Sequence, residues 1–285
     1  MARVFMFYSR LRAEEKMIIE AAKAREIPLE SIVVSDLAWP NDICQRKDVA
    51  LCRCIGHRQN LALALTLEAK GVITINHSDV MNICSDKIAT SSKLSIAGIP
   101  QPDYAVAFSL EGTLKCVEKM GYPVVLKPPV GSWGRLLAKV NDKDALEAVV
   151  EHKLHLGSQH SAIYIQKYVD KNGFDIRATI IGDCPVSAIR RCSNHWITNT
   201  ARGGEAQNYP LTDDLKKLLV DVQRAIGGKL LAVDVFETYN GYLVNEVNGQ
   251  PEFRSSHERI TGVDVAGKIV EMAWTLAQKS DENDF

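Results

Sequence analysis

Short apolar runs alternate with amphipathic stretches over residues 4–75. Residues 4–8 form an apolar run, and residues 14–25 carry Met17, Ile18 and Ala21 at the spacing of one helix face. The same reading predicts strands over 31–34, 48–54 and 72–75 and a helix over 60–69. Strands that alternate with helices indicate a parallel α/β layer.

The rest of the chain predicts two α+β units. A helix that starts at Asp86 and is closed by Gly98 leads to Pro100 and Pro102, which favour an extended connector. Residues 192–210 form an irregular polar stretch, and 280–285 a frayed tail. Further strands are predicted over 104–108, 123–127, 136–140, 163–169, 175–181, 186–191, 230–237 and 242–247, and helices over 110–120, 144–152, 213–226 and 265–278. The predicted domains are an N-terminal α/β domain (1–85), a central unit (86–160) and a C-terminal unit (161–285).

The composition is that of an ordinary soluble globular protein. The 285 residues are 46% hydrophobic and 24% charged with a net charge of -1, which excludes a uniformly basic nucleic-acid-binding surface. The longest uncharged stretch, residues 154–166, is too short to span a bilayer, and no apolar signal segment opens the chain, so we expect a cytoplasmic protein. Seven cysteines without paired metal-ligand spacing indicate reduced, buried thiols, although a redox role stays open.

A glycine-rich segment, Gly131-Ser132-Trp133-Gly134-Arg135, lies between two predicted strands and follows Lys127. Glycines let backbone N–H groups approach an anion, and a lysine at a strand end adds a positive charge. The segment therefore indicates phosphate binding. A purely structural glycine hairpin is the alternative.

Oxygen-bearing side chains lie on, or directly after, two predicted strands near the C-terminus. Glu246 and Asn248 are two residues apart and therefore share one face of a strand, and an antiparallel neighbour can bring Asp234 to that face. Such hard oxygen ligands suit Mg²⁺. A solvated strand end is the alternative.

The irregular polar stretch and the two predicted strands before it are rich in arginine and amide side chains. Arginine recognises carboxylate and phosphate through paired hydrogen bonds, so the group favours a substrate loop over a solvated one. Its members are Arg177, Arg190, Arg191, Asn194, His195, Trp196, Thr198, Asn199, Thr200, Arg202, Gly203 and Gly204.

Three common motifs are excluded. Residues 262–269 match most of the Walker A spacing, but Ile269 replaces the Ser or Thr that would bind Mg²⁺. No GxGxxG follows the first strand, and no GxSxG occurs, so neither a dinucleotide-binding Rossmann domain nor an α/β-hydrolase is supported.

Over nearly its whole length the chain resembles the ATP-grasp ligases, and within them the enzymes that modify ribosomal protein S6. The segments that carry the resemblance are Asp86-Lys87, Val124-Val-Leu-Lys127-Pro, Gly131-Ser-Trp-Gly-Arg135, Ile165-Gln-Lys-Tyr-Val169, Asp175-Ile-Arg177, Asp234 and Asn245-Glu-Val-Asn248. Residues 131–140 and 195–204 are most similar to ligases that join L-2-aminoadipate to the C-terminal glutamate of the acidic carrier protein LysW in lysine biosynthesis.

The resemblance implies an ATP-grasp fold behind an N-terminal α/β (pre-ATP-grasp) domain. It implies that Lys87 and Lys127 neutralise the ATP phosphates and that two Mg²⁺ ions are held by Asp234, Glu246 and Asn248. The other ATP-binding residues it implies are the lid Gly131, Ser132, Trp133 and Gly134, the adenine hinge Gln166, Lys167, Tyr168 and Val169, and Asp170 at the ribose.

The implied reaction has two steps. The carrier carboxylate attacks the γ-phosphate to form an acyl phosphate, and the amine of the amino acid then displaces phosphate. Arg177 and Arg202 are the implied catalytic residues, and the implied amino-acid-binding residues are Arg191, Asn199, Thr200 and Arg202. Related enzymes self-associate, so a dimer or tetramer is expected.

One segment departs from the aminoadipate pattern. After Asn248 the chain reads Gly249-Gln-Pro-Glu-Phe-Arg254, whereas aminoadipate ligases favour Met-Glu-Phe-Lys-Asn and glutamate-specific relatives favour Pro-Glu-Phe-Lys. Aminoadipate is the expected substrate. The alternatives are a glutamate ligase acting on the same carrier, on ribosomal protein S6 or on a cofactor, and an inactive ATP-grasp module that only binds the carrier.

Basic residues gather in two parts of this near-neutral chain. Arg46, Lys47, Arg53 and Arg58 are opposed nearby only by Asp42 and Asp48, and a second group comprises Arg177, Arg190, Arg191 and Arg202. We predict a basic track between the two groups that suits an acidic carrier tail.

Overall fold

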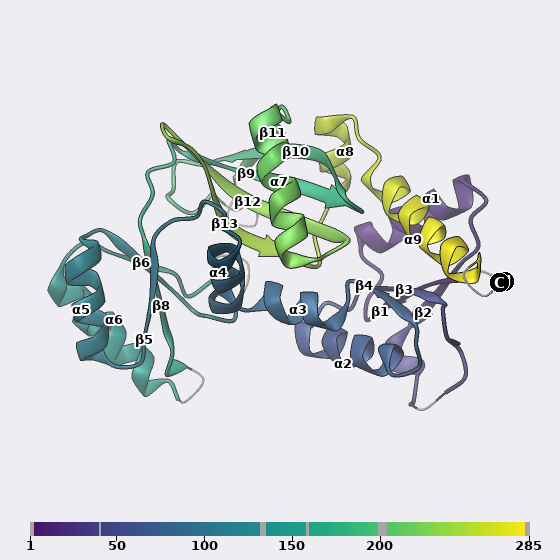
Figure 1. Cartoon of the computed structure of the whole chain (residues 1–285), viewed down its shortest axis with the longest axis horizontal. Coiled ribbons are helices and arrows are strands. Elements are labelled where there is room, and N and C mark those ends of the chain that lie inside the picture. Colours follow the sequence, from purple (N-terminus) through teal and green to yellow (C-terminus); the bar gives the residue numbers. More distant parts are fainter. Residues whose placement is uncertain (1–2, 40, 132–134, 158–159, 199–203, 283–285) are drawn as a thin grey trace.

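The computed structural model describes residues 3–39, 41–131, 135–157, 160–198 and 204–282. Its strands form three sheets. Figure 1 shows the N-terminal sheet and the central sheet at opposite ends of the molecule, with the five-stranded C-terminal sheet between them. Of the helices in these ranges, none combines the length and apolar character that a membrane span requires.

The N-terminal sheet is parallel, as predicted. Side chains alternate across it, so Met6 packs toward one layer of helices and Phe5 and Phe7 toward the other. The strand order is β2 (Leu29–Val33), β1 (Val4–Tyr8), β3 (Val49–Cys52) and β4 (Ile73–Ile75). The flanking elements are α1 (Ala13–Ala24), α2 (His57–Glu68) and the short 3-10 helix η1 (Val34–Asp36).

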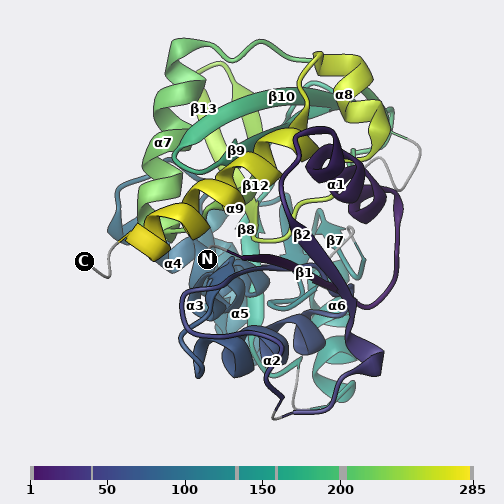
Figure 2. The same ribbon diagram turned by 90° about the vertical axis from the view of Figure 1, so that its right-hand side faces the viewer.

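The last helix of the chain completes this first domain. In α9 (Val265–Glu282), Ile269 and Ala273 share one apolar core with Ile18 of α1 and Met6 of β1. Figure 2 shows α9 lying beside α1. The predicted helix is therefore present, but it packs on the N-terminal sheet rather than within the C-terminal unit.

The central sheet is antiparallel, and α5 (Leu110–Met120) and α6 (Lys143–His155) supply the other half of its core. Its strand order is β5 (Tyr104–Ala107), β8 (Ile163–Lys167), β6 (Val124–Lys127) and β7 (Ala138–Val140). β8 hydrogen-bonds with both β5 and β6, although the predicted division at residue 160 assigned that strand to the C-terminal unit. The domain limits themselves stay a prediction.

The C-terminal sheet is also antiparallel. Its strand order is β11 (Glu205–Asn208), β10 (Cys184–Cys192), β9 (Phe174–Ile181), β12 (Leu230–Thr238) and β13 (Gly241–Asn248). The helices α3 (Ser78–Ser85), α4 (Lys87–Ile96) and α7 (Asp213–Ile226) pack on one face. β11 corrects the prediction of an irregular stretch over residues 192–210, because pairing with β10 makes a strand of a polar segment.

Two short helices, α3 and α8 (Ser255–Thr261), were not predicted. In α3, Val80 and Met81 are buried, so tertiary packing stabilises a segment with little helical pattern. The predicted start of the next helix is confirmed, since the Asp86 side chain accepts hydrogen bonds from the backbone N–H groups of Ile88 and Ala89 at 2.7 and 3.3 Å.

All seven cysteines are free thiols. Burial raises the pKa of Cys44 to about 12 and that of Cys54 to about 11, so both thiols stay protonated and unreactive at neutral pH.

Strand alternation leaves a polar face on each of the two antiparallel sheets. Val124 and Leu126 point into the central core, which turns Lys127 to the opposite face. In β12, Val233 and Val235 are core residues, which turns Asp234 away from that core. The candidate site lies between these two polar faces.

Candidate active site

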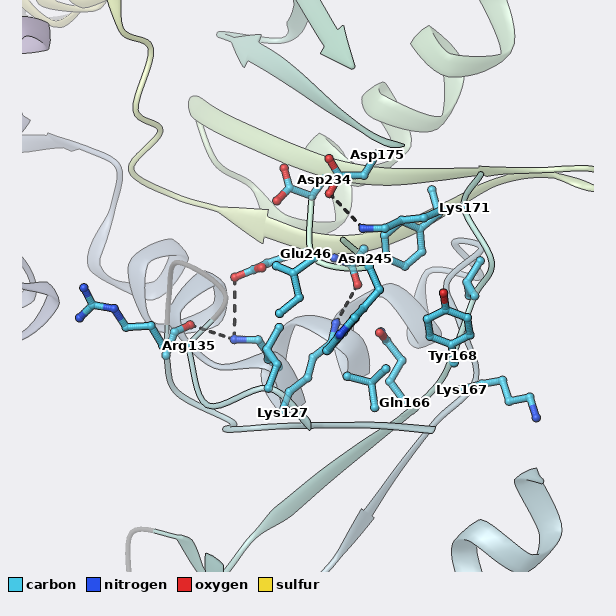
Figure 3. Close-up of a pocket in the computed structure, with 18 residues that line it drawn as sticks. Lys127, Arg135, Gln166, Lys167, Tyr168, Lys171, Asp175, Asp234, Asn245 and Glu246 are labelled. Atoms are coloured by element: carbon cyan, nitrogen blue, oxygen red, sulfur yellow. Dashed lines mark hydrogen bonds and ion pairs between the residues drawn. The ribbon is translucent and has the colours of Figure 1, made fainter. Parts of the chain in front are cut away.

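An inter-sheet cavity separates the central sheet from the C-terminal sheet. Figure 3 shows Asp175, Asp234 and Glu246 on the five-stranded sheet, facing Lys127 and Gln166 of the central sheet. The cavity brings together nine of the residues that the sequence assigned to ATP or Mg²⁺, namely Lys87, Lys127, Gly131, Gln166, Lys167, Tyr168, Val169, Asp234 and Glu246.

Two lysines supply positive charge to one end of this cavity. Lys127 is buried, and its Nζ donates a hydrogen bond to Asn245 Oδ1 at 2.8 Å. Burial lowers the pKa of Lys127 to about 7, and the nearby carboxylate of Glu246 only partly opposes this shift. The Nζ of Lys87 donates to the Gly131 carbonyl at 2.9 Å and lies 3.8 Å from Glu246 Oε1.

Three charged residues form a row across neighbouring strands. Arg177 of β9 is in register with Asp234 of β12, which is in register with Glu246 of β13. Arg177 donates from Nε and Nη2 to the two carboxylate oxygens of Asp234 at 2.8 and 2.9 Å. Burial alone would raise the pKa of Asp234, but Arg177 and Arg191 outweigh it and lower the pKa to about 2.

Arg191 of β10 contacts Asp234 of this row and is almost fully buried. It donates from Nε and Nη2 to Asp175 at 2.7 and 2.8 Å, and its Nη2 lies 3.0 Å from Asp234 Oδ2. Two carboxylates therefore already engage the guanidinium that the sequence assigned to the amino acid. A substrate-binding role for Arg191 stays a prediction, and these contacts favour a role in fixing the two aspartates.

Lys171 is a cavity residue that the sequence did not single out. It is buried, donates from Nζ to Thr198 Oγ1 at 2.8 Å, and lies 3.8 Å from Asp175 Oδ2. Its location between the predicted hinge and the Asp175 motif was the one available signal. Burial lowers its pKa, and Asp175 opposes that shift.

The predicted hinge residues differ in where their side chains point. Gln166 is buried at the cavity, and Tyr168 follows it at the end of β8. Lys167 points away, as Figure 3 shows, and its Nζ donates to the carbonyls of Met120 and Gly121 at 3.0 and 2.9 Å. Its ammonium group is therefore engaged away from the cavity.

Asp170 lies outside the inter-sheet cavity lining. The side chain is exposed, and its Oδ1 accepts a hydrogen bond from the backbone N–H of Asn172 at 3.2 Å. The predicted ribose contact stays untested.

A second cavity, the junction cavity, opens where the N-terminal domain meets the C-terminal sheet. It has a volume of about 260 Å³, which is room for a small organic molecule, and it is bounded by Arg12, His57, Arg177, Asn248 and Pro251. Gly131 and Glu246 border both cavities, so the two adjoin at the charged row.

Six predicted site residues lie outside the described residues: Ser132, Trp133, Gly134, Asn199, Thr200 and Arg202. Their roles as lid, substrate loop and catalytic arginine therefore stay predictions.

One predicted member of the basic track lies inside the protein. Arg53 is 1% exposed and paired with Glu15, so it adds no positive charge to the surface. Arg46 and Lys47 precede β3, whereas Arg58 follows it, which places these residues at opposite ends of the strand. The linear sequence brought them together, but the strand separates them.

Family models match two consecutive parts of the chain. A LysX preATP-grasp domain matches residues 4–83, and a RimK-like ATP-grasp domain matches residues 84–273. The chain belongs to the RimK-like ATP-grasp family. This confirms the resemblance and the fold class inferred from the sequence, and it makes the protein an ATP-grasp ligase, an enzyme that joins a carboxylate to an amine.

Two proteins similar to this chain over most of its length are named as ligases of the carrier protein LysW. The glutamate–LysW ligase ArgX of Sulfurisphaera tokodaii is 38% identical over 94% of this chain and 97% of its own. The α-aminoadipate–LysW ligase LysX of Saccharolobus solfataricus is 35% identical over 94% of this chain and 99% of its own.

Solved structures show the same fold. A RimK domain ATP-grasp protein from Sphaerobacter thermophilus has a TM-score of 0.78 and 30% identity over 95% of this chain and 99% of its own. The D-alanine–D-alanine ligase from Bacillus anthracis covers 100% of both chains with a TM-score of 0.70, and at 18% identity it supports the fold alone.

ATP-grasp ligases bind ATP and typically Mg²⁺, and the residues of this ligase fit such an ion. Asp234, Glu246 and Asn248 offer hard carboxylate and amide oxygens. Among the described residues, Asn248 Nδ2 is buried without a hydrogen-bond partner, but an N–H donor does not bind a cation, so only Oδ1 of that amide is a possible ligand. No group of three or more His, Cys, Asp or Glu side chains that could hold a metal ion occurs in the described ranges. Binding of two ions stays a prediction.

The affinity of this ATP-grasp ligase for ATP should fall as the pH rises above 7. Lys127, whose pKa is about 7, loses its proton in the free site above that pH, and if it contacts the phosphates, as predicted, their binding should restore it. Nucleotide binding then takes up a proton, and the Kd rises by up to about tenfold per pH unit. Calorimetric titration of Mg²⁺-ATP from about pH 7 to about pH 9 measures this slope.

The matched control is Lys127→Arg, which keeps its charge over that range and should give a flat profile. A wild-type Kd that does not change with pH would contradict the assignment of Lys127 to the phosphates.

Proposed function

We propose that this ligase uses ATP to join an acidic α-amino acid to the C-terminal glutamate carboxylate of a LysW-type carrier protein. The observation that carries the proposal is the row Arg177, Asp234 and Glu246, at which the inter-sheet cavity and the junction cavity adjoin. A nucleotide in the first cavity and a carboxylate in the second would meet there. The named LysW ligases at 35–38% identity support the carrier as partner.

The residues of the inter-sheet cavity bind the nucleotide, and those of the junction cavity bind the carrier carboxylate. Lys87 and Lys127 hold the phosphates of ATP in the inter-sheet cavity. Asp234, Glu246 and Asn248 would hold Mg²⁺, which when bound supplies positive charge to the phosphate oxygens. Arg177, fixed by Asp234, orients the carrier carboxylate from the junction cavity side.

The proposed reaction has two steps. A carboxylate oxygen attacks the γ-phosphorus, the bond to the β-phosphate oxygen breaks, and ADP leaves. The amine nitrogen then attacks the carbonyl carbon, phosphate leaves, and the amine proton passes to solvent or phosphate. Arg177 stabilises negative charge on the carboxyl oxygens in both steps.

L-2-aminoadipate is the first candidate amino acid, because the segments over 131–140 and 195–204 are similar to aminoadipate ligases. Glutamate is the second candidate, favoured by Pro251, which borders the junction cavity at the position where glutamate-specific relatives carry proline.

A steady-state panel with purified carrier separates these candidates. We expect kcat/KM for aminoadipate to exceed that for glutamate by at least about tenfold, the size of effect that one methylene produces in a fitted pocket. The reverse preference would assign glutamate. Turnover with neither amino acid would contradict the proposed function.

A further inference from the structure

One wall of the junction cavity is attached to the N-terminal domain. Residues 249–252 follow β13 and border the cavity together with Asn248, the last residue of that strand. Asn76 Nδ2 donates to the Gly249 carbonyl at 2.6 Å, and Gln250 Nε2 donates to the Cys54 carbonyl at 2.7 Å. The wall therefore takes its position from the N-terminal domain as well as from the C-terminal sheet.

Arg53 makes the most buried of these attachments. Its Nη1 donates to the Pro251 carbonyl at 3.1 Å, and its Cζ lies 5.6 Å from the centre of the Phe253 ring. Its Nε donates to Glu15 Oε1 at 3.1 Å, and both charged side chains are at most 1% exposed. The Arg53 side chain thus links the carbonyl of Pro251 and the ring of Phe253 to the end of β3 and, through Glu15, to α1.

Glu15 is shared between two arginines. Arg12 donates to it from Nε and Nη2 at 3.0 and 2.8 Å, and Arg12 Nη1 lies 3.6 Å from Glu252 Oε1. Loss of Arg53 would therefore leave Glu15 paired with Arg12, so no uncompensated buried carboxylate would remain. A variant at Arg53 can be expected to fold.

We propose that Arg53 is a positioning residue for the amino-acid substrate. It holds residues 249–252 against the N-terminal domain. In this way the N-terminal domain sets the affinity for the amino acid, although Arg53 itself does not touch it. Arg53 does not border the junction cavity. Pro251, which Arg53 holds, and Glu252, which Arg12 holds, both border it. The inference rests on the proposed function, because it requires the amino acid to enter the junction cavity beside the carrier carboxylate.

The test compares Arg53→Met and Arg53→Lys with the control Arg3→Met. Arg3 donates from Nε to Asp48 Oδ1 at 3.0 Å at the opposite end of β3, so its loss also breaks an arginine–carboxylate pair in this domain. For Arg53→Met we expect the KM for aminoadipate and glutamate to rise by at least about tenfold, with the KM for ATP within about twofold. Arg53→Lys should be intermediate, because an ammonium group cannot reproduce the forked geometry.

Amide hydrogen exchange gives a second readout that needs no turnover. Amides of residues 249–254 should exchange faster in Arg53→Met than in the wild type, and Arg3→Met should leave them unchanged. Unchanged exchange, or faster exchange with an unchanged amino-acid KM, would overturn the inference. If the wild type used neither amino acid, the proposed function would fail, while exchange would still test whether Arg53 holds the wall.

Discussion

Glu246→Gln is expected to lower kcat by at least about 100-fold while changing the free energy of unfolding by less than about 1 kcal/mol. The side chain is 26% exposed and borders both cavities, and its ion pair with Lys87 spans 3.8 Å. The amide keeps the size of the carboxylate but removes the negative charge that would hold Mg²⁺ at the phosphates. ADP release at saturating ATP and urea unfolding measure the two quantities.

Glu205→Gln is the matched control, since Glu205 is an exposed carboxylate on β11 of the same sheet. It should leave both quantities unchanged. A kcat for Glu246→Gln within about threefold of the wild type would remove Glu246 from the reacting centre, because loss of a group that stabilises charge in the transition state costs far more.

Asp234 is a less decisive target for the same test. Its carboxylate pairs with Arg177 and with the buried Arg191. An amide there would leave Arg177 without its carboxylate partner and Arg191 with Asp175 alone, so stability should fall together with activity. Lost activity could then follow from lost folding, which Glu246→Gln avoids.

Lys127→Met is expected to weaken ATP binding by about 10-fold to 100-fold, the size of a hydrogen bond between charged groups. The lysine is buried, and burial lowers its pKa to about 7. Keeping this side chain charged inside the protein therefore lowers the stability of the fold. A methionine of similar length relieves that cost. We therefore expect stability to be unchanged or increased while calorimetry shows the loss of affinity.

Lys167→Met is the control from the same sheet. Its ammonium group donates to the Met120 and Gly121 carbonyls and points away from the cavity. This variant should lose stability and keep its affinity for ATP. Equal effects of the two variants on ATP affinity would show that Lys127 does not meet the phosphates.

The local pattern of the sequence was enough to predict most elements. The helices over 110–120 and 213–226 begin and end as predicted, because each combines an apolar face with a capping residue, Ser109 or Thr212, and a terminal glycine. β11 and α3 were missed because strand pairing or packing, rather than their own pattern, stabilises them. The placement of α9 on the N-terminal sheet is a long-range contact that no local pattern contains.

The candidate site was predictable where it depended on strand alternation. The two-residue spacing placed Glu246 and Asn248 on one face, and the register then brought Asp234 opposite Glu246. The pairing of Arg177 and Arg191 with Asp234 was not foreseen, because it depends on which strands are neighbours. The burial of Lys171 and the outward direction of Lys167 are likewise tertiary properties.

The central claim is tested most directly by an omission experiment with ATP, Mg²⁺, a purified LysW-type carrier and L-2-aminoadipate or glutamate. The account predicts that ADP forms at full rate only when all components are present, and that the carrier gains one amino acid through an amide at its C-terminal glutamate side chain. ATP binding without ADP formation under any combination, or ADP formation with an unmodified carrier, would contradict it.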